Sequence, residues 1–182
     1  MSPEFLNPRR WWALIVLAAA QFVVIMDTSI IGVALPQIRN ALGFSQSDLS
    51  WVFNAYVIAF GGLLLLGGKL SDVFGARKLL TAGFTVLVIG SLIAGLADTA
   101  GVEIVGRALQ GTAAALIAPA ALTMVMVLFS HDPRELTKAM GLYGAAAPAG
   151  GTAGVFLGGA LTQGLDWRYT LLINIPLAIA VL

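Results

Sequence analysis

The sequence predicts an all-α membrane protein, because apolar residues dominate it and are gathered into long runs. Of its 182 residues, 59% are hydrophobic and only 10% are charged, whereas a soluble globular domain has about 25% charged residues. Most of the runs have about 20 residues or more, the length that an α-helix needs to cross a hydrocarbon layer about 30 Å thick. Only short polar loops separate them.

The chain is divided into a cytoplasmic N-terminal tail, residues 1–10, and one bundle of transmembrane helices, residues 11–182. Arg9 and Arg10 precede two tryptophans, and cations followed by aromatic rings are typical of the inner membrane interface. The apolar run that follows reaches about Leu35 and is too long for a cleaved signal peptide. The first helix is therefore interpreted as a retained span.

Four further complete spans are predicted, which brings the number of complete transmembrane helices to five. Their approximate ranges are 49–69, 78–97, 101–129 and 136–163. A sixth run begins near Tyr169 and has about fourteen residues, roughly 21 Å of helix, so it is expected to be a truncated span.

Lysine and arginine are distributed unequally between the two ends of the predicted helices. One end has Arg9, Arg10, Lys69, Arg77, Lys78, Arg134 and Lys138, whereas the other has only Arg39 and Arg168. The outer loop predicted over 98–103 contains no cation. Because cytoplasmic loops are enriched in cations, the sequence predicts a multi-pass protein of the plasma membrane with a cytoplasmic N-terminus.

Several chemistries are disfavoured by composition. The chain has no cysteine, which excludes disulfides, thiolate metal sites and cysteine nucleophiles. The single histidine, His131, lies in the polar stretch SHDPRE and is interpreted as a loop residue. The serines have no basic residue placed to activate them. We therefore expect no metal, no cofactor and no enzyme activity, and a membrane-embedded enzyme is a disfavoured alternative.

Two charged residues fall inside predicted spans, Asp27 in the first and Arg107 in the fourth. Each costs roughly 2.5–3.5 kcal/mol at a lipid-facing helix centre, so both are expected to face the bundle interior. They lie at similar depths, roughly 12 Å and 9 Å from the outer ends of their spans. Gln110, one turn beyond Arg107, can contact either residue. Asp27 is interpreted as a proton carrier, with a purely structural ion pair as the open alternative.

The segment between the second and third spans carries a short charged motif, GKLSDVFGARK, read as a tight polar turn. It resembles the loop between helices 2 and 3 of the major facilitator superfamily, G-x-x-x-D-(R/K)-x-G-R-(R/K), and Val73 and Ala76 depart from that pattern. The matching residues, for which the resemblance implies a gating role, are Gly68, Asp72, Gly75, Arg77 and Lys78. The resemblance also implies that, in this chain alone, Asp72 has only local partners such as Arg77 or backbone amides.

Two further motifs resemble the fourteen-helix drug:proton antiporters of that family. The stretch DTSIIGVALPQI, which begins at Asp27, is similar to their helix 1 element D-x-T-x-V-N-V-A-L-P. The stretch RALQGTAAALIAP, which begins at Arg107, is similar to the helix 4 motif R-x-x-Q-G-x-x-x-x-x-x-x-P. The resemblance implies that Asp27, Arg107 and Gln110 couple transport to protons.

The fifth predicted span contains Gly150, Gly154 and Gly158 at intervals of four residues, a spacing that lets helices pack backbone to backbone. Pro148 is expected to kink this span. Together with Gly159, the three glycines resemble the antiporter motif of helix 5, although valine stands at position 155 where that motif has proline. The stretch DWRYTLLINIP resembles the family's W-R-x-x-F-x-x-N-x-P at the start of helix 6.

These motifs predict the N-terminal half of a major facilitator transporter that exports small hydrophobic or cationic compounds in exchange for protons. Its expected partners are the lipid bilayer, protons, the substrate and a missing C-terminal half, and no nucleic acid. Candidate residues of the substrate pocket, each of which could instead be a packing residue, are Gln21, Met26, Asn54, Tyr56 and Tyr143. The alternative is a non-transporting fragment or accessory membrane subunit of the same family.

Overall fold

The computed structural model describes residues 9–182, so residues 1–8 of the predicted tail lie outside the described part of the chain. The described residues form helices and contain no β-strand, which confirms the all-α prediction. The helices are α1 (Arg9–Leu42), α2 (Ser50–Phe74), α3 (Ala76–Gly95), α4 (Ala100–Phe129), α5 (Pro133–Gly164), α6 (Arg168–Leu172) and α7 (Asn174–Val181).

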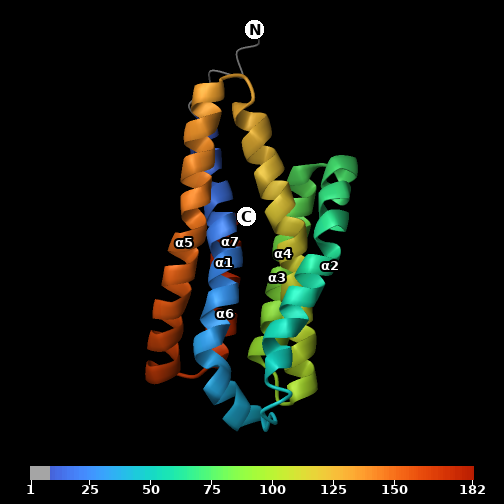
Figure 1. Cartoon of the computed structure of the whole chain (residues 1–182), viewed down its shortest axis with the longest axis vertical. Coiled ribbons are helices and arrows are strands. Elements are labelled where there is room, and N and C mark those ends of the chain that lie inside the picture. The colour runs from blue at the N-terminus through green and yellow to red at the C-terminus, as the bar shows by residue number, and fades with distance from the viewer. Residues whose placement is uncertain (1–8) are drawn as a thin grey trace.

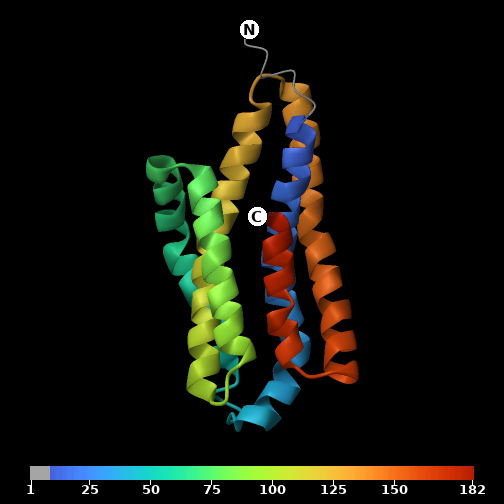
Figure 2. The same ribbon diagram turned by 180° about the vertical axis from the view of Figure 1, so that it is seen from behind.

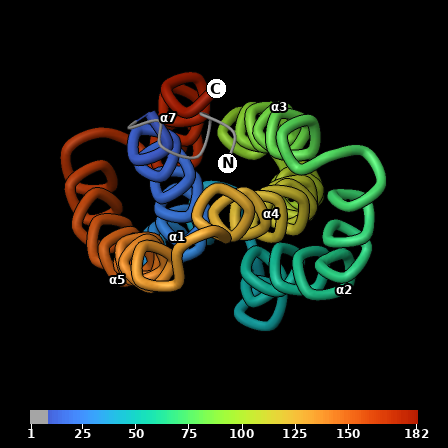
Figure 3. The backbone as a smooth tube through the Cα atoms, turned by 90° about the horizontal axis from the view of Figure 1, so that it is seen from above, coloured from blue at the N-terminus to red at the C-terminus, as the bar shows by residue number. Residues whose placement is uncertain are grey.

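The helices form one elongated bundle in which α4 is central (Figures 1 and 3). Helices α2 and α3 both pack against α4, and they contact each other much less. On the other side, α5 packs along α1, and α1 contacts α4. Helices α6 and α7 follow each other on the side of α1 and α3 (Figure 2).

The connections alternate between the two ends of the bundle, as in a multi-pass membrane protein. The start of α1, the α2–α3 turn and the α4–α5 loop lie at one end, and the α1–α2, α3–α4 and α5–α6 connections lie at the opposite end (Figures 1 and 2). Helices α1 to α4 are long and apolar enough to cross a membrane. Helix α5 has 32 residues, or about 48 Å, which is also sufficient length. The chain ends about midway along the bundle (Figure 2).

Three predicted boundaries differ from the structure. Helix α1 begins at Arg9, within the predicted tail, and continues through Pro36 to Leu42 instead of ending near Leu35. The outer loop predicted over 98–103 is mostly helix, because α4 begins at Ala100. The sixth span is divided at Ile173 into α6 and α7. Helix α1 is longer than the apolar run that predicts it, because polar residues at its ends are also helical.

The charged motif between α2 and α3 is largely helical and not a polar loop as predicted. Gly68 and Asp72 both lie within α2, which ends at Phe74. Gly75 alone separates the two helices, with φ at +92°, a conformation that favours glycine. Its backbone N–H donates a hydrogen bond of 3.0 Å to the Ser71 carbonyl oxygen. The chain therefore reverses direction at Gly75 alone. The other residues of the motif belong to the last turns of α2 and the first turn of α3.

The glycine strip of α5 lies against the backbone of α1. A Cβ atom built on Gly150 would come within 2.5 Å of the Phe22 carbonyl oxygen, and one on Gly154 within 2.8 Å of the Met26 carbonyl oxygen. Gly158 is similarly crowded, whereas a Cβ on Gly159 would meet nothing within 4 Å. The strip therefore contains Gly150, Gly154 and Gly158 but does not include Gly159. Helix α5 is continuous through Pro148.

Replacing Gly150 by alanine is expected to destabilise the bundle by roughly 1–3 kcal/mol, because the added methyl group overlaps the Phe22 carbonyl oxygen. The matched control is Gly159→Ala in the same helix, where a methyl group has open space and alanine only improves helix propensity. Thermal unfolding of both purified variants in detergent measures the difference. Equal unfolding temperatures would show that α5 does not depend on this close approach.

Candidate functional site

The candidate site is built around an ion pair between two helices that are far apart in sequence. Arg107 on α4 donates through Nη1 to Asp27 Oδ2 on α1 at 3.2 Å. The two side chains are 0% and 1% exposed. Because a buried charge without a partner is strongly disfavoured, this contact constrains how α1 and α4 can pack.

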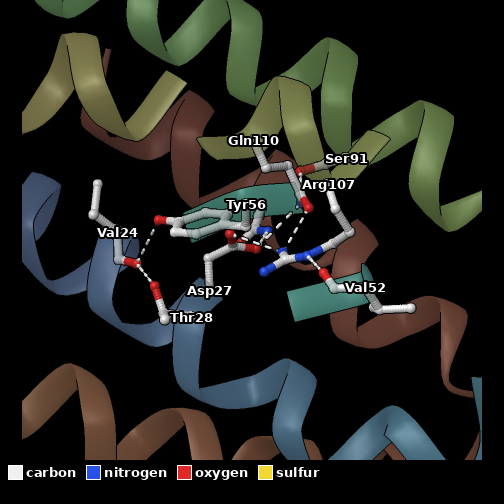
Figure 4. A network of polar contacts seen from close by, with 9 residues as sticks. Val24, Asp27, Thr28, Val52, Tyr56, Ser91, Arg107 and Gln110 are labelled. Atoms are coloured by element: carbon white, nitrogen blue, oxygen red, sulfur yellow. Dashed lines mark hydrogen bonds and ion pairs between the residues drawn. The ribbon is translucent and has the colours of Figure 1, made fainter. Parts of the chain in front are cut away.

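Gln110 links both members of the pair (Figure 4). Its Oε1 atom accepts a hydrogen bond from Arg107 Nη1 at 2.7 Å. Its Nε2 atom donates to Asp27 Oδ1 at 3.2 Å and to Ser91 Oγ on α3 at 2.9 Å. The amide has both a donor and an acceptor end, so it bridges the carboxylate and the guanidinium as the sequence predicts it can.

Helix α2 supplies the remaining contacts of the guanidinium. Arg107 Nε donates to the Val52 carbonyl oxygen at 3.2 Å. The Arg107 Cζ atom lies 4.6 Å from the centroid of the Tyr56 ring, a distance at which the ring face attracts a cation. The Tyr56 hydroxyl donates to the Val24 carbonyl oxygen at 3.4 Å. Tyr56, predicted as a pocket residue, is therefore part of the ion-pair environment.

Two members of the network were missed by sequence reasoning. Asn174, at the start of α7, donates through Nδ2 to Asp27 Oδ1 at 2.5 Å, and Ser91 accepts from Gln110. Asn174 is the asparagine of the W-R-x-x-F-x-x-N-x-P resemblance, so a signal existed but no role was assigned. Ser91 is one of several hydroxyl residues in its predicted span and carries no comparable signal. With these residues, five helices meet at Asp27 and Arg107.

The predicted pocket residues do not form one cavity. Gln21 and Tyr143 are joined by a 3.1 Å hydrogen bond and line an open cavity of about 680 Å³ between α1, α2, α4 and α5. Met26 is fully buried and Tyr56 lies at the ion pair, whereas Asn54 is exposed on α2. Residue type and depth predicted these positions, but they could not fix the direction of each side chain around its helix.

The charged motif lies at one end of the same cavity. Gly68, Lys69 and Asp72 contribute to its lining. Asp72 is exposed, and within the described part of the chain its carboxylate makes neither the contact with Arg77 nor the contact with backbone amides that the sequence predicted.

Replacing Asn174 by alanine is expected to destabilise the protein by roughly 1.5–3 kcal/mol, because Asp27 loses a charge-assisted hydrogen bond in a buried setting. Asn54→Ala is the control, since it is the same substitution at an exposed asparagine. Unfolding by a graded denaturant in detergent compares them. If N174A is no less stable than N54A, α7 is not held through Asp27.

Comparison with known proteins relates this arrangement to membrane transporters. The puromycin resistance protein pur8 of Streptomyces alboniger is 45% identical over 176 residues, which are 97% of this chain and 35% of that protein. The cephamycin export protein CmcT of Amycolatopsis lactamdurans is 46% identical over 170 residues, again 35% of its length. The chain thus spans about a third of either relative.

A solved structure has the same fold. A bacterial homolog of the human lysosomal transporter Spinster, in an inward-facing and occupied conformation, superposes with a TM-score of 0.83 at 18% sequence identity. The superposition covers 96% of this chain and 44% of that one. The Major Facilitator Superfamily profile matches residues 17–182. The chain is a multi-pass membrane protein that belongs to the major facilitator superfamily.

Proposed function

We propose that this chain forms the N-terminal half of a proton-coupled efflux transporter, with residues 11–182 as its N-terminal transmembrane bundle. The observation that carries the proposal is the buried ion pair of Asp27 and Arg107, with Gln110 and Asn174 bound to the same carboxylate. Ionisable residues at membrane depth that face a bundle interior usually serve transport. The resistance and export functions in the names of both relatives support the direction of transport.

Proton binding to Asp27 changes the forces between helices. The neutral acid no longer attracts Arg107, so the guanidinium loses the anion that holds α4 against α1. Removing one partner of a buried pair costs roughly 3–5 kcal/mol, which is large enough to shift a population between two helix arrangements. Protonation would therefore favour a second arrangement of α1, α4 and α7, and deprotonation would restore this one.

The substrate path is proposed to include the cavity lined by Gln21 and Tyr143. Its walls are mostly apolar, with the hydrogen-bonded Gln21–Tyr143 pair within it and Lys69 and Asp72 at one end. Apolar walls with few polar groups suit small hydrophobic compounds. The C-terminal half of the transporter would close this open side.

The orientation is proposed to place the start of α1 and the α2–α3 turn in the cytoplasm. Because the chain has no cysteine, single cysteines test this directly. A cysteine at Val73, which is 71% exposed, should react with an impermeant maleimide only after the cells are permeabilised. A cysteine at Ser47 in the α1–α2 connection is the control and should react in intact cells. The reverse labelling pattern would overturn the orientation.

Asp27→Asn in the full-length transporter should reduce proton-driven efflux to the level of membranes without the protein, because the amide keeps the shape of the side chain and cannot carry a proton. Asp98→Asn is the matched control, since the Asp98 side chain is 91% exposed. Transport of a lipophilic cation by vesicles with an imposed pH gradient, normalised to folded protein, is the measurement. Gradient-dependent transport by D27N equal to that of D98N would reject proton coupling through Asp27.

A further inference from the structure

Glu103 is a buried carboxyl group outside the network around Asp27. It lies in the first turn of α4 and is 0% exposed. Neither of its carboxyl oxygens has a hydrogen-bond partner among the described residues. One turn further along the helix, the Nη2 atom of Arg107 is also buried and unpartnered within residues 9–182. Two groups of opposite charge are therefore both incompletely satisfied on the same helix.

The spacing of the two residues allows them to meet without movement of the backbone. Residues four apart on a helix have Cβ atoms about 5–6 Å apart, and an acid that precedes a base at this spacing is in the favourable order. The first turn of a helix also favours a negative charge. At this spacing an arginine side chain has the reach to contact either Asp27 across the bundle or Glu103 on its own helix.

The charges around Glu103 limit how many of the buried acids can be ionised. The charged groups that act on it are Arg107 on α4, Asp27 on α1 and Arg168 on α6. Arg168 lies at the end of the bundle, is 33% exposed and contacts Asp98 at 3.4 Å. The buried interior thus holds one guanidinium and two carboxyl groups.

The neighbouring helices do not supply a second cation to this interior. Near the pair, α2 contributes the Tyr56 phenol and α3 the Ser91 hydroxyl, and α7 contributes the Asn174 amide. A single guanidinium balances one carboxylate, and a second ionised carboxylate would be buried without compensation. The charge balance therefore favours a state in which only one of the two carboxyl groups is ionised.

We propose that Glu103 is a second proton-holding position and that Arg107 alternates between the two carboxyl groups. In this structure Arg107 contacts the Asp27 carboxylate, and the proton is on Glu103. In the alternative state the O–H bond on Glu103 has broken, the proton is bound to an Asp27 oxygen, and the guanidinium contacts the Glu103 carboxylate. The summed charge of the three groups is zero in both states. The inference rests on the proposed proton coupling and names a further residue in it.

Infrared spectroscopy of the purified chain at neutral pH tests the exchange, through the carbonyl stretch of buried protonated carboxyl groups. The wild-type chain should show one such band, and Glu103→Gln should remove it. Asp27→Asn should also remove it, because Glu103 then gives up its proton to pair with Arg107. Asp98→Asn, at an exposed side chain, should leave the band unchanged. Absence of the band from the wild type, or its persistence in D27N, would overturn the proposal.

A second readout covers the case in which Glu103→Gln folds poorly. Glu103→Asp keeps a carboxyl group and should retain the band, and the D27N spectrum alone decides whether Glu103 responds to Asp27. Where E103Q does fold, Asp27→Asn should lower the unfolding temperature more in E103Q than in the wild type, because Arg107 then has no carboxylate. Equal shifts would contradict the exchange. Neither readout involves transport, so the inference and the proposed function can fail separately.

Discussion

The structure depends on one electrostatic constraint, which is that Arg107, the fully buried guanidinium among residues 9–182, must face a carboxylate. Arg107 and Asp27 meet at 3.2 Å with almost no solvent exposure. Further hydrogen bonds to the two side chains come from Gln110, the Val52 carbonyl oxygen and Asn174. Because these groups come from α1, α2, α4 and α7, the pair determines which helices surround the interior.

Small residues allow the helices to approach closely enough for these contacts. A Cβ atom on Gly111 would collide with the backbone of Tyr56, and one on Gly106 would come within 2.6 Å of Ala94. These glycines bring α2 and α3 against α4 at the level of the site, as Gly150 and Gly154 bring α5 against α1. Lipid solvates apolar side chains as well as a helix neighbour does, so close packing and buried polar contacts hold such a bundle together.

The sequence predicts the parts of this arrangement that have a distinctive residue type or spacing. Charges at membrane depth identify Asp27 and Arg107, and a four-residue glycine repeat identifies the packing face of α5. Sequence does not predict the side-chain direction of Met26 or Asn54, since a polar or bulky residue in an apolar helix is compatible with several rotations. Glu103 falls where the outer loop predicted over 98–103 overlaps the span predicted over 101–129, and no role was predicted for it; α4 begins three residues earlier and buries it.

If the Asp27–Arg107 contact sets the helix arrangement, the two residues must be coupled in stability, and a double-mutant cycle on the free energy of unfolding tests this most directly. The four proteins are the wild type, D27N, R107Q and the double variant, unfolded in the same detergent at neutral pH. Asp27→Asn is expected to destabilise the wild type but to be neutral or stabilising once Arg107 is glutamine, with a coupling of roughly 0.5–3 kcal/mol. The same change in unfolding free energy for Asp27→Asn in both backgrounds would contradict this role of the Asp27–Arg107 contact.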